Sequence, residues 1–460
     1  MNRVRLLTVL SLLVILVLVA ACAAPAPEVV EVEVTRVVEK EGETVIEEVI
    51  VTATPEPAVE KVTLLVWDQF GDETATVAVD LIYEKFMAEH PNIEIQREVM
   101  ASDDIEMTSR TALASGTGPD IIYADVSPTR ELMDAGLILP LDDYADQFGW
   151  RDRFYETGLS WTLYQGKLWG LGLESEFVGI FVNKDLFEAE GLEVPQTISE
   201  ALEFCRVAKE RGYVPMAHSQ SGGWQTYFSF TMPAHNYVGI DYIEKLLFEG
   251  EGRWDSEGFI EAMKITYEDM KEAGCFVEDL NALDFNGAID FFNNQEAFML
   301  PTGTWVVDRI LDFSTEHTVE MMPWFDMETG EPRAYTMGMG SAWFVSAASE
   351  HPDEAALFLD YLFSEEAVTI WIESASRIPP VPVDTDQLDL LPLQKFVVDT
   401  LETAGTGQGD IALGWDVDLI VPEEFNTMLK DGWQAVYAST KTVEEQMADL
   451  QQVWEEFGPY

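Results

Sequence analysis

Two of the three Trp-Asp pairs in this chain are candidate ligand contacts. Trp67 precedes Asp68, with Phe70 close behind, and Trp415 precedes Asp416. A flat aromatic ring beside a hydrogen-bonding carboxylate suits a ligand that has C–H groups on its faces and hydroxyls at its edge, such as a sugar. We therefore take Trp67, Asp68, Phe70, Trp415 and Asp416 as candidate ligand contacts, with packing in a loop as the alternative for the first three.

Three further residues are candidate contacts for such a ligand. Asp125 follows an apolar run, where it serves either a ligand or the N-cap of the next helix. Trp224 comes after Gly222 and Gly223, so its ring is expected at the edge of a lobe. Arg377 is one of few cations; its planar guanidinium either bridges two hydroxyls of a ligand or forms a structural salt bridge. These three complete the candidates that the residues alone suggest.

Other chemistries lack their signatures. The five histidines show no ligand spacing, and the sequence contains neither an HExxH nor a CxxC motif. A Walker lysine motif and a GxSxG elbow are also absent from the sequence, which argues against nucleotide hydrolysis and α/β-hydrolase chemistry. We expect no metal site, no catalytic residue and no cofactor.

The candidate residues follow strands in a repeating strand–helix pattern. Strands are predicted at 62–67, 93–99 and 119–124, with helices at 74–90 and 103–115 between them. Strands that alternate with helices predict a parallel sheet in an α/β fold. In such sheets ligand groups lie at the carboxyl ends of the strands, which is where Trp67, Asp68 and Asp125 fall.

The composition is that of an exported, folded and very acidic protein. The 460 residues are 47% hydrophobic, enough for two to three domains or one bilobal unit, and the net charge is −58. Such a charge repels phosphate backbones, so nucleic acid is not expected as a partner. Cys205 and Cys275 form a disulfide outside the cell or remain as buried thiols; the sequence leaves both open.

The N-terminus carries an export signal. Arg3 and Arg5 precede an apolar run from Leu6 to Ala21, whose 16 residues are short of the ~20 that a membrane-spanning helix needs. Residues 1–21 are thus predicted to be a signal peptide. Val19-Ala20-Ala21-Cys22 resembles the lipobox of bacterial lipoproteins, which implies lipidation of Cys22 and attachment to the membrane through a lipid anchor.

Residues 22–60 are expected to form an acidic tether. Valine alternates with glutamate and threonine here, which would also fit a pair of strands. The charge, the low complexity and the flanking prolines at 25, 27, 55 and 57 favour an extended tether instead. The folded body then begins near Lys61.

Six segments of the body occur in an order typical of one family. They read FMAEHPNIEIQ, ALASGTGPDIIYADV, DAGLILPLDDY, YQGKLWGLGLESEFVGIFVNKDLFEAEGL, FFNNQEAFMLPTGTW and MGSAWFVSAASEHPDEAALFLDYLFSEEA. In this succession the chain resembles the extracellular solute-binding proteins of ABC importers, specifically the carbohydrate-binding group that includes maltose-binding protein. The resemblance covers nearly everything from Lys61 onward. One departure lies near Gly172, where the family usually has proline.

The resemblance implies a fold of two α/β lobes joined by crossover strands, with a ligand cleft between them. The first lobe would hold residues 61–173 and 338–377, and the second residues 174–337 and 378–460. It also implies a sugar-contacting hinge carboxylate at Glu176, a role that Glu174 can take instead. Trp305 matches the family's Gly-x-Trp and is expected to stack on the ligand, whereas Trp343 is expected in the core.

The implied function is that of a receptor rather than an enzyme. The protein would bind a sugar or oligosaccharide outside the cytoplasm, as a monomer, and deliver it to the membrane subunits of an ABC permease. A secreted glycoside hydrolase, or a receptor for another solute such as a polyamine, remain as alternatives. The type of sugar depends on groove shape, which the sequence does not specify.

Overall fold

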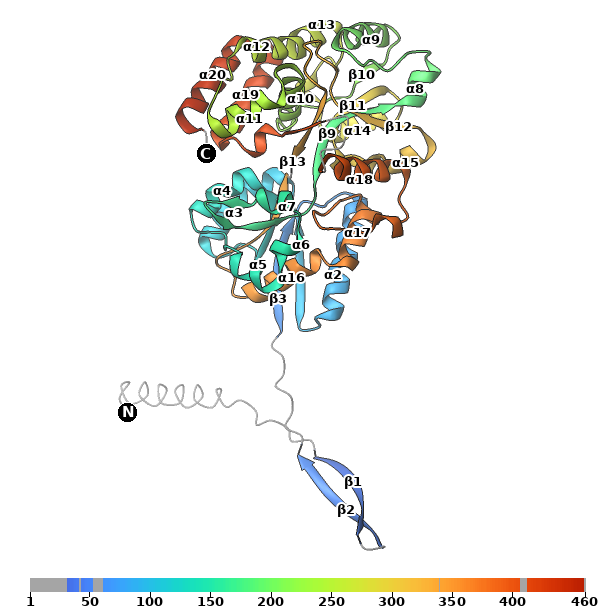
Figure 1. Cartoon of the computed structure of the whole chain (residues 1–460), viewed down its shortest axis with the longest axis vertical. Coiled ribbons are helices and arrows are strands. Elements are labelled where there is room, and N and C mark those ends of the chain that lie inside the picture. The colour runs from blue at the N-terminus through green and yellow to red at the C-terminus, as the bar shows by residue number, and fades with distance from the viewer. Residues whose placement is uncertain (1–30, 41–42, 53–60, 339, 406–411, 459–460) are drawn as a thin grey trace, which may run out of the picture. The chain divides into compact units, whose positions relative to one another are not determined.

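The computed structural model describes residues 31–40, 43–52, 61–338, 340–405 and 412–458. The chain divides into two compact units, residues 1–61 and 62–460 (Figure 1). The signal peptide, Cys22 and the lipobox lie outside the described residues. Among the residues that are described, no helix is both long enough and apolar enough to cross a bilayer.

The N-terminal unit contains a pair of antiparallel strands. β1 (Glu31–Lys40) pairs with β2 (Glu43–Thr52) in a continuous register from Glu31 opposite Thr52 to Lys40 opposite Glu43. The structure thus differs from the extended tether favoured above and adopts the alternative. The reason lies in the alternating valines and isoleucines, because β-branched residues favour extended, paired backbone.

The first lobe is built on a five-stranded sheet. Its strand order is β4 (Ile93–Val99), β3 (Val62–Asp68), β5 (Ile121–Asp125), β14 (Ser341–Val345) and β8 (Gly170–Gly172). β3 runs parallel to β4 and β5, as the strand–helix pattern predicts, whereas β14 is antiparallel to both of its neighbours. The α/β prediction is thereby confirmed for this lobe.

The helices of the same chain segments cover this sheet. They are α2 (Glu73–Glu89), α3 (Ser102–Ser115), α4 (Val126–Asp134), α5 (Asp142–Phe148), α6 (Trp150–Arg153), α7 (Glu156–Ser160), α16 (Pro352–Leu362) and α17 (Glu365–Ala375), with a small hairpin of β6 (Leu163–Tyr164) and β7 (Lys167–Leu168). Residues of β3, α2, α16 and α17 share one apolar core, which includes the fully buried Trp343 and Trp371. Trp343 is therefore a core residue, as predicted.

The second lobe is built on a six-stranded sheet. Its order is β10 (Val214–Met216), β11 (Ala297–Gly303), β9 (Glu176–Asn183), β13 (Ala334–Gly338) and β15 (Ala412–Trp415), and β12 (Val319–Met322) also pairs with β9. β9 is antiparallel to β11, β12 and β13, whereas β15 runs parallel to β13. The two sheets lie in the two lobes that Figure 1 shows one above the other.

Helices and helical turns surround the second sheet. They are α8 (Lys184–Ala189), α9 (Ile198–Glu210), α10 (Thr226–Val238), α11 (Ile240–Glu244), η1 (Lys245–Glu249), α12 (Glu257–Lys264), η2 (Ile265–Asp269), α13 (Met270–Ala273), η3 (Leu280–Ala282), α14 (Phe285–Asn293), η4 (Thr304–Val306), α15 (Val307–Glu316), α18 (Pro392–Gly405), η6 (Val417–Leu419), α19 (Glu423–Tyr437) and α20 (Val443–Phe457). The short η5 (Thr385–Gln387) lies in a segment that packs against the first-lobe core. Cys205 on α9 and Cys275 after α13 form a disulfide with a Cα–Cα distance of 4.7 Å. The pairing resolves the alternative left open by the sequence.

The chain crosses between the two sheets at three places. It leaves the first sheet after Gly172 and enters the second at Glu176, and it returns between Gly338 and Ser341. The third crossing comes after α17: Val381, Leu388 and Leu390 still pack against the first-lobe core, and α18 then packs in the second lobe. The lobe boundaries at 61–173 with 338–377 and 174–337 with 378–460 stay a proposal.

Candidate functional site between the lobes

The boundary between the lobes is formed by the ends of strands from both sheets. β5 ends at Asp125, which pairs with Ser341 at the start of β14. β13 ends at Gly338, opposite Glu176 at the start of β9, and β15 ends beside it at Trp415. Ligands of open α/β sheets bind at the carboxyl ends of strands. This boundary is therefore the candidate site.

Four carboxylates gather around the second crossing, residues 338–341. We call Asp125, Glu176, Asp416 and Asp418 the crossing cluster. Asp125 accepts a hydrogen bond from the hydroxyl of Ser341, whose oxygen in turn accepts one of 2.9 Å from the Gln69 amide nitrogen. The first-lobe member of the cluster is thus held by neighbours in its own lobe.

Two glycines of the second crossing, Gly338 and Gly340, lie close to second-lobe residues of the crossing cluster. A Cβ placed on Gly340 would lie 3.5 Å from Glu176 Oε2, and one placed on Gly338 would lie 3.5 Å from the Cβ of Asp416 and 2.1 Å from Leu419. A side chain at Gly338 would therefore displace Leu419, the last residue of η6. Because glycine stands at both places, the backbone of the crossing passes close to the carboxylates.

Burial dominates the electrostatics of the crossing cluster. It raises the pKa of Glu176 and of Asp418 well above the usual range, because a desolvated carboxylate is unfavourable. The neighbouring negative charges add to this: Glu174 in the case of Glu176, Asp416 in the case of Asp418, and Asp125 in both. These carboxyls thus favour the protonated form, which donates a hydrogen bond as well as accepting one.

A second group of charges lies on the other crossings, and we call it the hinge ion network. Arg377 Nη1 donates a hydrogen bond of 2.6 Å to Glu174 Oε1, and its Nη2 lies 3.9 Å from Asp308 Oδ2 on α15. All three side chains are buried. The Ser175 amide also donates to the Ile378 carbonyl at 3.0 Å. The network therefore ties the first crossing to the third and to the second lobe.

Asp308 keeps a high proton affinity within this network. Burial raises its pKa to about 6, although the charge of Arg377 acts in the opposite direction. Neither of its carboxylate oxygens has a hydrogen-bond partner of good geometry among the described residues. Desolvation thus outweighs the attraction of a guanidinium that lies nearly 4 Å away.

A pair of tryptophans joins the lobes beside the crossing cluster. Trp161, just after α7 of the first lobe, lies with its ring centroid 5.1 Å from that of Trp415. The Trp415 indole nitrogen donates a 2.9 Å hydrogen bond to Glu244, and its ring also contacts Phe248, which is 51% exposed. Trp415 is half-buried, so part of its ring remains available to a ligand.

A separate aromatic group lies on the second lobe. Trp224 and Trp305, both half-buried, have centroids 6.3 Å apart, and Phe228 and Phe285 pack against them. A Cβ on Gly303 would lie 1.9 Å from the Trp305 ring. Glycine at this position lets the indole lie flat on the end of β11, which explains the Gly-x-Trp pattern physically.

Comparison with known proteins identifies the family. The family model described as bacterial extracellular solute-binding protein matches residues 71–369. The chain belongs to this family. A multiple sugar-binding protein of Streptococcus mutans serotype c is 24% identical over 320 residues, which are 67% of this chain and 73% of the relative. A maltotriose-binding protein of Pyrococcus abyssi is 24% identical over 277 residues, 59% of this chain and 56% of the relative.

Solved structures share the fold of this solute-binding protein. One, from a study of xylan utilization by the thermophilic bacterium Caldanaerobius polysaccharolyticus, superposes with a TM-score of 0.76 at 24% identity and covers 85% of this chain and all of its own. A chitin oligosaccharide binding protein gives a TM-score of 0.75 at 20% identity, covering 86% of this chain and 99% of its own. The two-lobed α/β fold with a cleft between lobes is thereby established, as the sequence predicts.

In the structure, residues 67–70 make contacts within the first lobe. Asp68 is fully buried and accepts hydrogen bonds of 2.7 and 2.8 Å from Arg97 Nε and Nη2. Phe70 stacks on Tyr123 with centroids 4.7 Å apart, and Trp67 is 8% exposed. Ligand contact by these three residues stays a prediction, although their present contacts are all within the first lobe.

The other candidates fall into two places. Asp125, Glu176, Asp416, Arg377 and Trp415 lie together at the lobe boundary, whereas Trp224 and Trp305 form their own group on the second lobe. Their roles as ligand contacts stay predictions.

Sequence reasoning missed Asp418, Asp308 and Trp161. Asp418 stands two residues after the predicted Asp416, and Asp308 three residues after Trp305, so both were within reach of the motifs. Trp161 carries no such signal, because only the fold brings it to Trp415.

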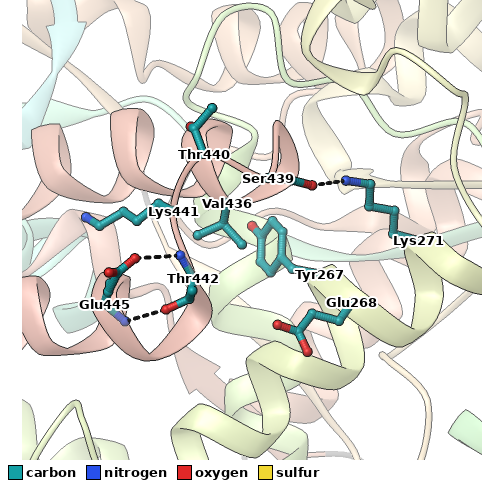
Figure 2. Close-up of a pocket in the computed structure, with 9 residues that line it drawn as sticks. All are labelled: Tyr267, Glu268, Lys271, Val436, Ser439, Thr440, Lys441, Thr442 and Glu445. Carbon is teal, nitrogen blue, oxygen red and sulfur yellow. Dashed lines mark hydrogen bonds between the residues drawn. The ribbon is translucent and has the colours of Figure 1, made fainter.

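A surface pocket of about 420 Å³ lies elsewhere on the second lobe (Figure 2). It is lined by residues of η2, α13, the C-terminal end of α19 and the start of α20, and none of them is a candidate named above. Its two lysines are already engaged: Lys271 donates to Ser439, and Lys441 pairs with Asp449 at 2.6 Å. The described residues contain no group of three or more His, Cys, Asp or Glu arranged to hold a metal ion.

Proposed function

We propose that this protein binds a carbohydrate between its lobes and delivers it to the permease of an ABC importer. The observation that carries the proposal is the pairing of Trp161 and Trp415, one from each lobe, directly beside the buried carboxyl of Asp416. An aromatic face and a carboxyl group are the two partners that a sugar requires. The relatives support the ligand class, since one binds multiple sugars and another maltotriose by name.

In the proposed mechanism the lobes close on the ligand. Trp415 would stack on a face of the sugar, and the crossing cluster would exchange hydrogen bonds with its hydroxyls. Because the clustered carboxyls lie on both lobes and on the crossing, a ligand that contacts them favours the closed arrangement over the open one. The permease can then recognise the closed arrangement of the lobes.

The test is a panel of malto-, cello-, xylo- and chito-oligosaccharides. Saturable quenching of tryptophan fluorescence, with a rise in melting temperature and no product after prolonged incubation, supports a receptor without catalytic activity. Released product with turnover would instead indicate a glycoside hydrolase. A shift with polyamines alone, and with none of the sugars, would overturn the carbohydrate proposal.

The place of the protein is part of the proposal. The family is extracellular. The lipobox of Val19 to Cys22 favours attachment to the membrane by lipid, and we propose that the protein acts as a monomer. Replacing Cys22 by alanine should release the protein from membranes in cell fractionation, while binding of the sugar is retained. A variant that stays in the membrane fraction would contradict the anchor and leave the binding function untouched.

A further inference from the structure

The crossing cluster contains unsatisfied acidic oxygens in a buried place. Asp416 is 5% exposed, and neither its Oδ1 nor the Oδ1 of Asp418 has a hydrogen-bond partner of good geometry among the described residues. No lysine or arginine is among the main causes of the pKa shift of either residue, and the two carboxyls hydrogen-bond to each other. A buried polar oxygen without a partner is costly. The pair is therefore suited to receive hydrogen-bond donors from outside the chain.

The arginines around this place are already engaged. Arg377 is shared between Glu174 and Asp308. Arg130 of α4 donates across the boundary to the carbonyl of Leu419 at 3.1 Å. The charge of Arg377 is therefore matched by acids of the chain, although its buried Nε has no hydrogen-bond partner among the described residues.

Two other cations near the boundary are committed in the same way. Arg309 donates to Asn286 at 3.0 Å, packs over the Phe285 ring and lies 4.0 Å from Asp72. Lys430 lies 5.7 Å from the centroid of the Tyr227 ring, and its charge lowers the pKa of Glu423. The boundary thus offers carboxylate acceptors in excess of cations.

Further acidic groups extend this surplus. The pKa of Tyr227, on α10, is raised well above its usual value by burial and then by Asp418, Glu423, Glu106 and Asp125. These four carboxylates come from both lobes and act on the same hydroxyl. The negative charge around the crossing therefore comes from acids of both lobes and not from one loop.

We infer that the site selects its carbohydrate by charge: saccharides that carry a carboxylate, sulfate or phosphate are excluded, and a free amine on the sugar strengthens binding. The inference rests on the proposed carbohydrate function and adds the class of sugar to it. An acidic sugar would bring a further negative charge at low dielectric to the Asp416–Asp418 pair, and the charge of the nearby Arg377 is already matched by Glu174 and Asp308. An ammonium group would donate to the unsatisfied oxygens and offset their charge.

The test compares sugars of equal length that differ in charge, and the salt dependence separates the effect of charge from that of the altered substituent. The probes are chito-oligosaccharides of two to six units in the fully N-acetylated and the fully deacetylated form, and cellobiose with cellobiouronic acid. Affinities are measured by calorimetry at low salt and at 0.5 M salt, where charge effects are screened over about 4–5 Å. We expect the amine form to bind at least tenfold more tightly than the acetylated form, with the advantage reduced at high salt, and the uronic acid not to bind.

A matched pair of variants assigns the effect to the crossing cluster. Asp418→Asn should reduce the advantage of the amine severalfold and leave the affinity for neutral sugars less changed. Asp431→Asn removes an exposed carboxylate of α19 and should leave both affinities unchanged. If both variants behave alike, the effect is one of overall charge and the assignment to the cluster is overturned.

The outcomes separate the inference from the proposed function. Binding of cellobiouronic acid as tight as that of cellobiose, or of acetylated sugars tighter than amine sugars, overturns charge selection while the carbohydrate proposal stands. A rise in melting temperature with spermidine but with no saccharide of either panel overturns the carbohydrate proposal itself.

Discussion

The hinge ion network and the crossing cluster are both buried groups of acids between the lobes, and they differ in one respect. In the first, Arg377 lies between Glu174 and Asp308. In the second, no cation is among the main causes of the pKa shifts of Asp416 and Asp418. Both groups have buried carboxyl oxygens without a hydrogen-bond partner among the described residues, and they differ in the guanidinium that the first group contains.

The difference separates a structural from a binding role. A buried ion pair with both partners present holds its neighbours in place, and it becomes costly only when one partner is removed. A buried group of like charges costs free energy in the empty protein and recovers it with a ligand. Stability and affinity should therefore respond in opposite ways to changes in the two groups.

Removal of Arg377 should have the largest effect. Arg377→Met leaves Glu174 and Asp308 buried without a cation, and we expect a loss of about 3–5 kcal/mol in the free energy of unfolding. Urea unfolding followed by fluorescence measures it. Arg206→Met breaks an exposed pair with Glu203 and should cost under ~1 kcal/mol. Equal losses in the two variants would contradict a structural role for the network.

The pH dependence of stability should reveal Asp308. Its pKa is raised from 3.8 to about 6 in the folded protein, so the folded state holds the proton more tightly than the unfolded state. Its contribution to stability is full below pH ~4 and is lost as the pH rises through about 6, by about 3 kcal/mol in all. Asp308→Asn should flatten the stability curve between these values.

The control for this prediction is on the same helix. Asp312 is exposed on α15, and Asp312→Asn should leave the curve of unfolding free energy against pH as it is in the unmodified protein. A curve for Asp308→Asn that keeps its full slope would show that the carboxyl titrates normally and is not desolvated.

Neutralising the crossing cluster should change affinity more than stability. Asp416→Asn removes a like charge beside Asp418, so the melting temperature should stay the same or rise. The affinity for the sugar found in the panel should fall about 10-fold to 100-fold, because a buried hydrogen-bond acceptor for the ligand is lost. A lower melting temperature with unchanged affinity would show that Asp416 has a structural role, like the hinge ion network.

The smallest expected effect concerns the tryptophan pair. Trp415→Ala removes a half-buried ring, and we expect the affinity to fall about tenfold, since an aromatic contact contributes roughly 0.5–1.5 kcal/mol beyond its buried area. Calorimetry with the same sugar measures it. Trp343→Ala, in the first core, should instead lower stability by about 3–5 kcal/mol. Unchanged affinity in Trp415→Ala would show that the tryptophan pair does not contact the ligand.

The positions of the candidate residues at strand ends could be predicted from the sequence, but the residues that they contact in the fold could not. Asp125 and Trp415-Asp416 stand where an apolar run stops, a local pattern that survives in the fold. The partner of Asp68 is Arg97, one strand away, and the choice depends on the register of β3 with β4. Trp161 meets Trp415 only through the packing of two lobes. Contacts of this kind follow from long-range pairing, which local patterns do not encode.

The position of β14 has a consequence for how the protein is made. This strand lies between β5 and β8 in the first sheet, although more than a third of the chain separates it from each of them. Until Val345 has been synthesised, β5 and β8 each present an unpaired edge, and the first lobe cannot close its core. Contacts so distant in sequence slow folding. The first sheet therefore cannot be completed before residues 341–345 are made, and the proposed export would act on a chain whose first lobe is still incompletely folded.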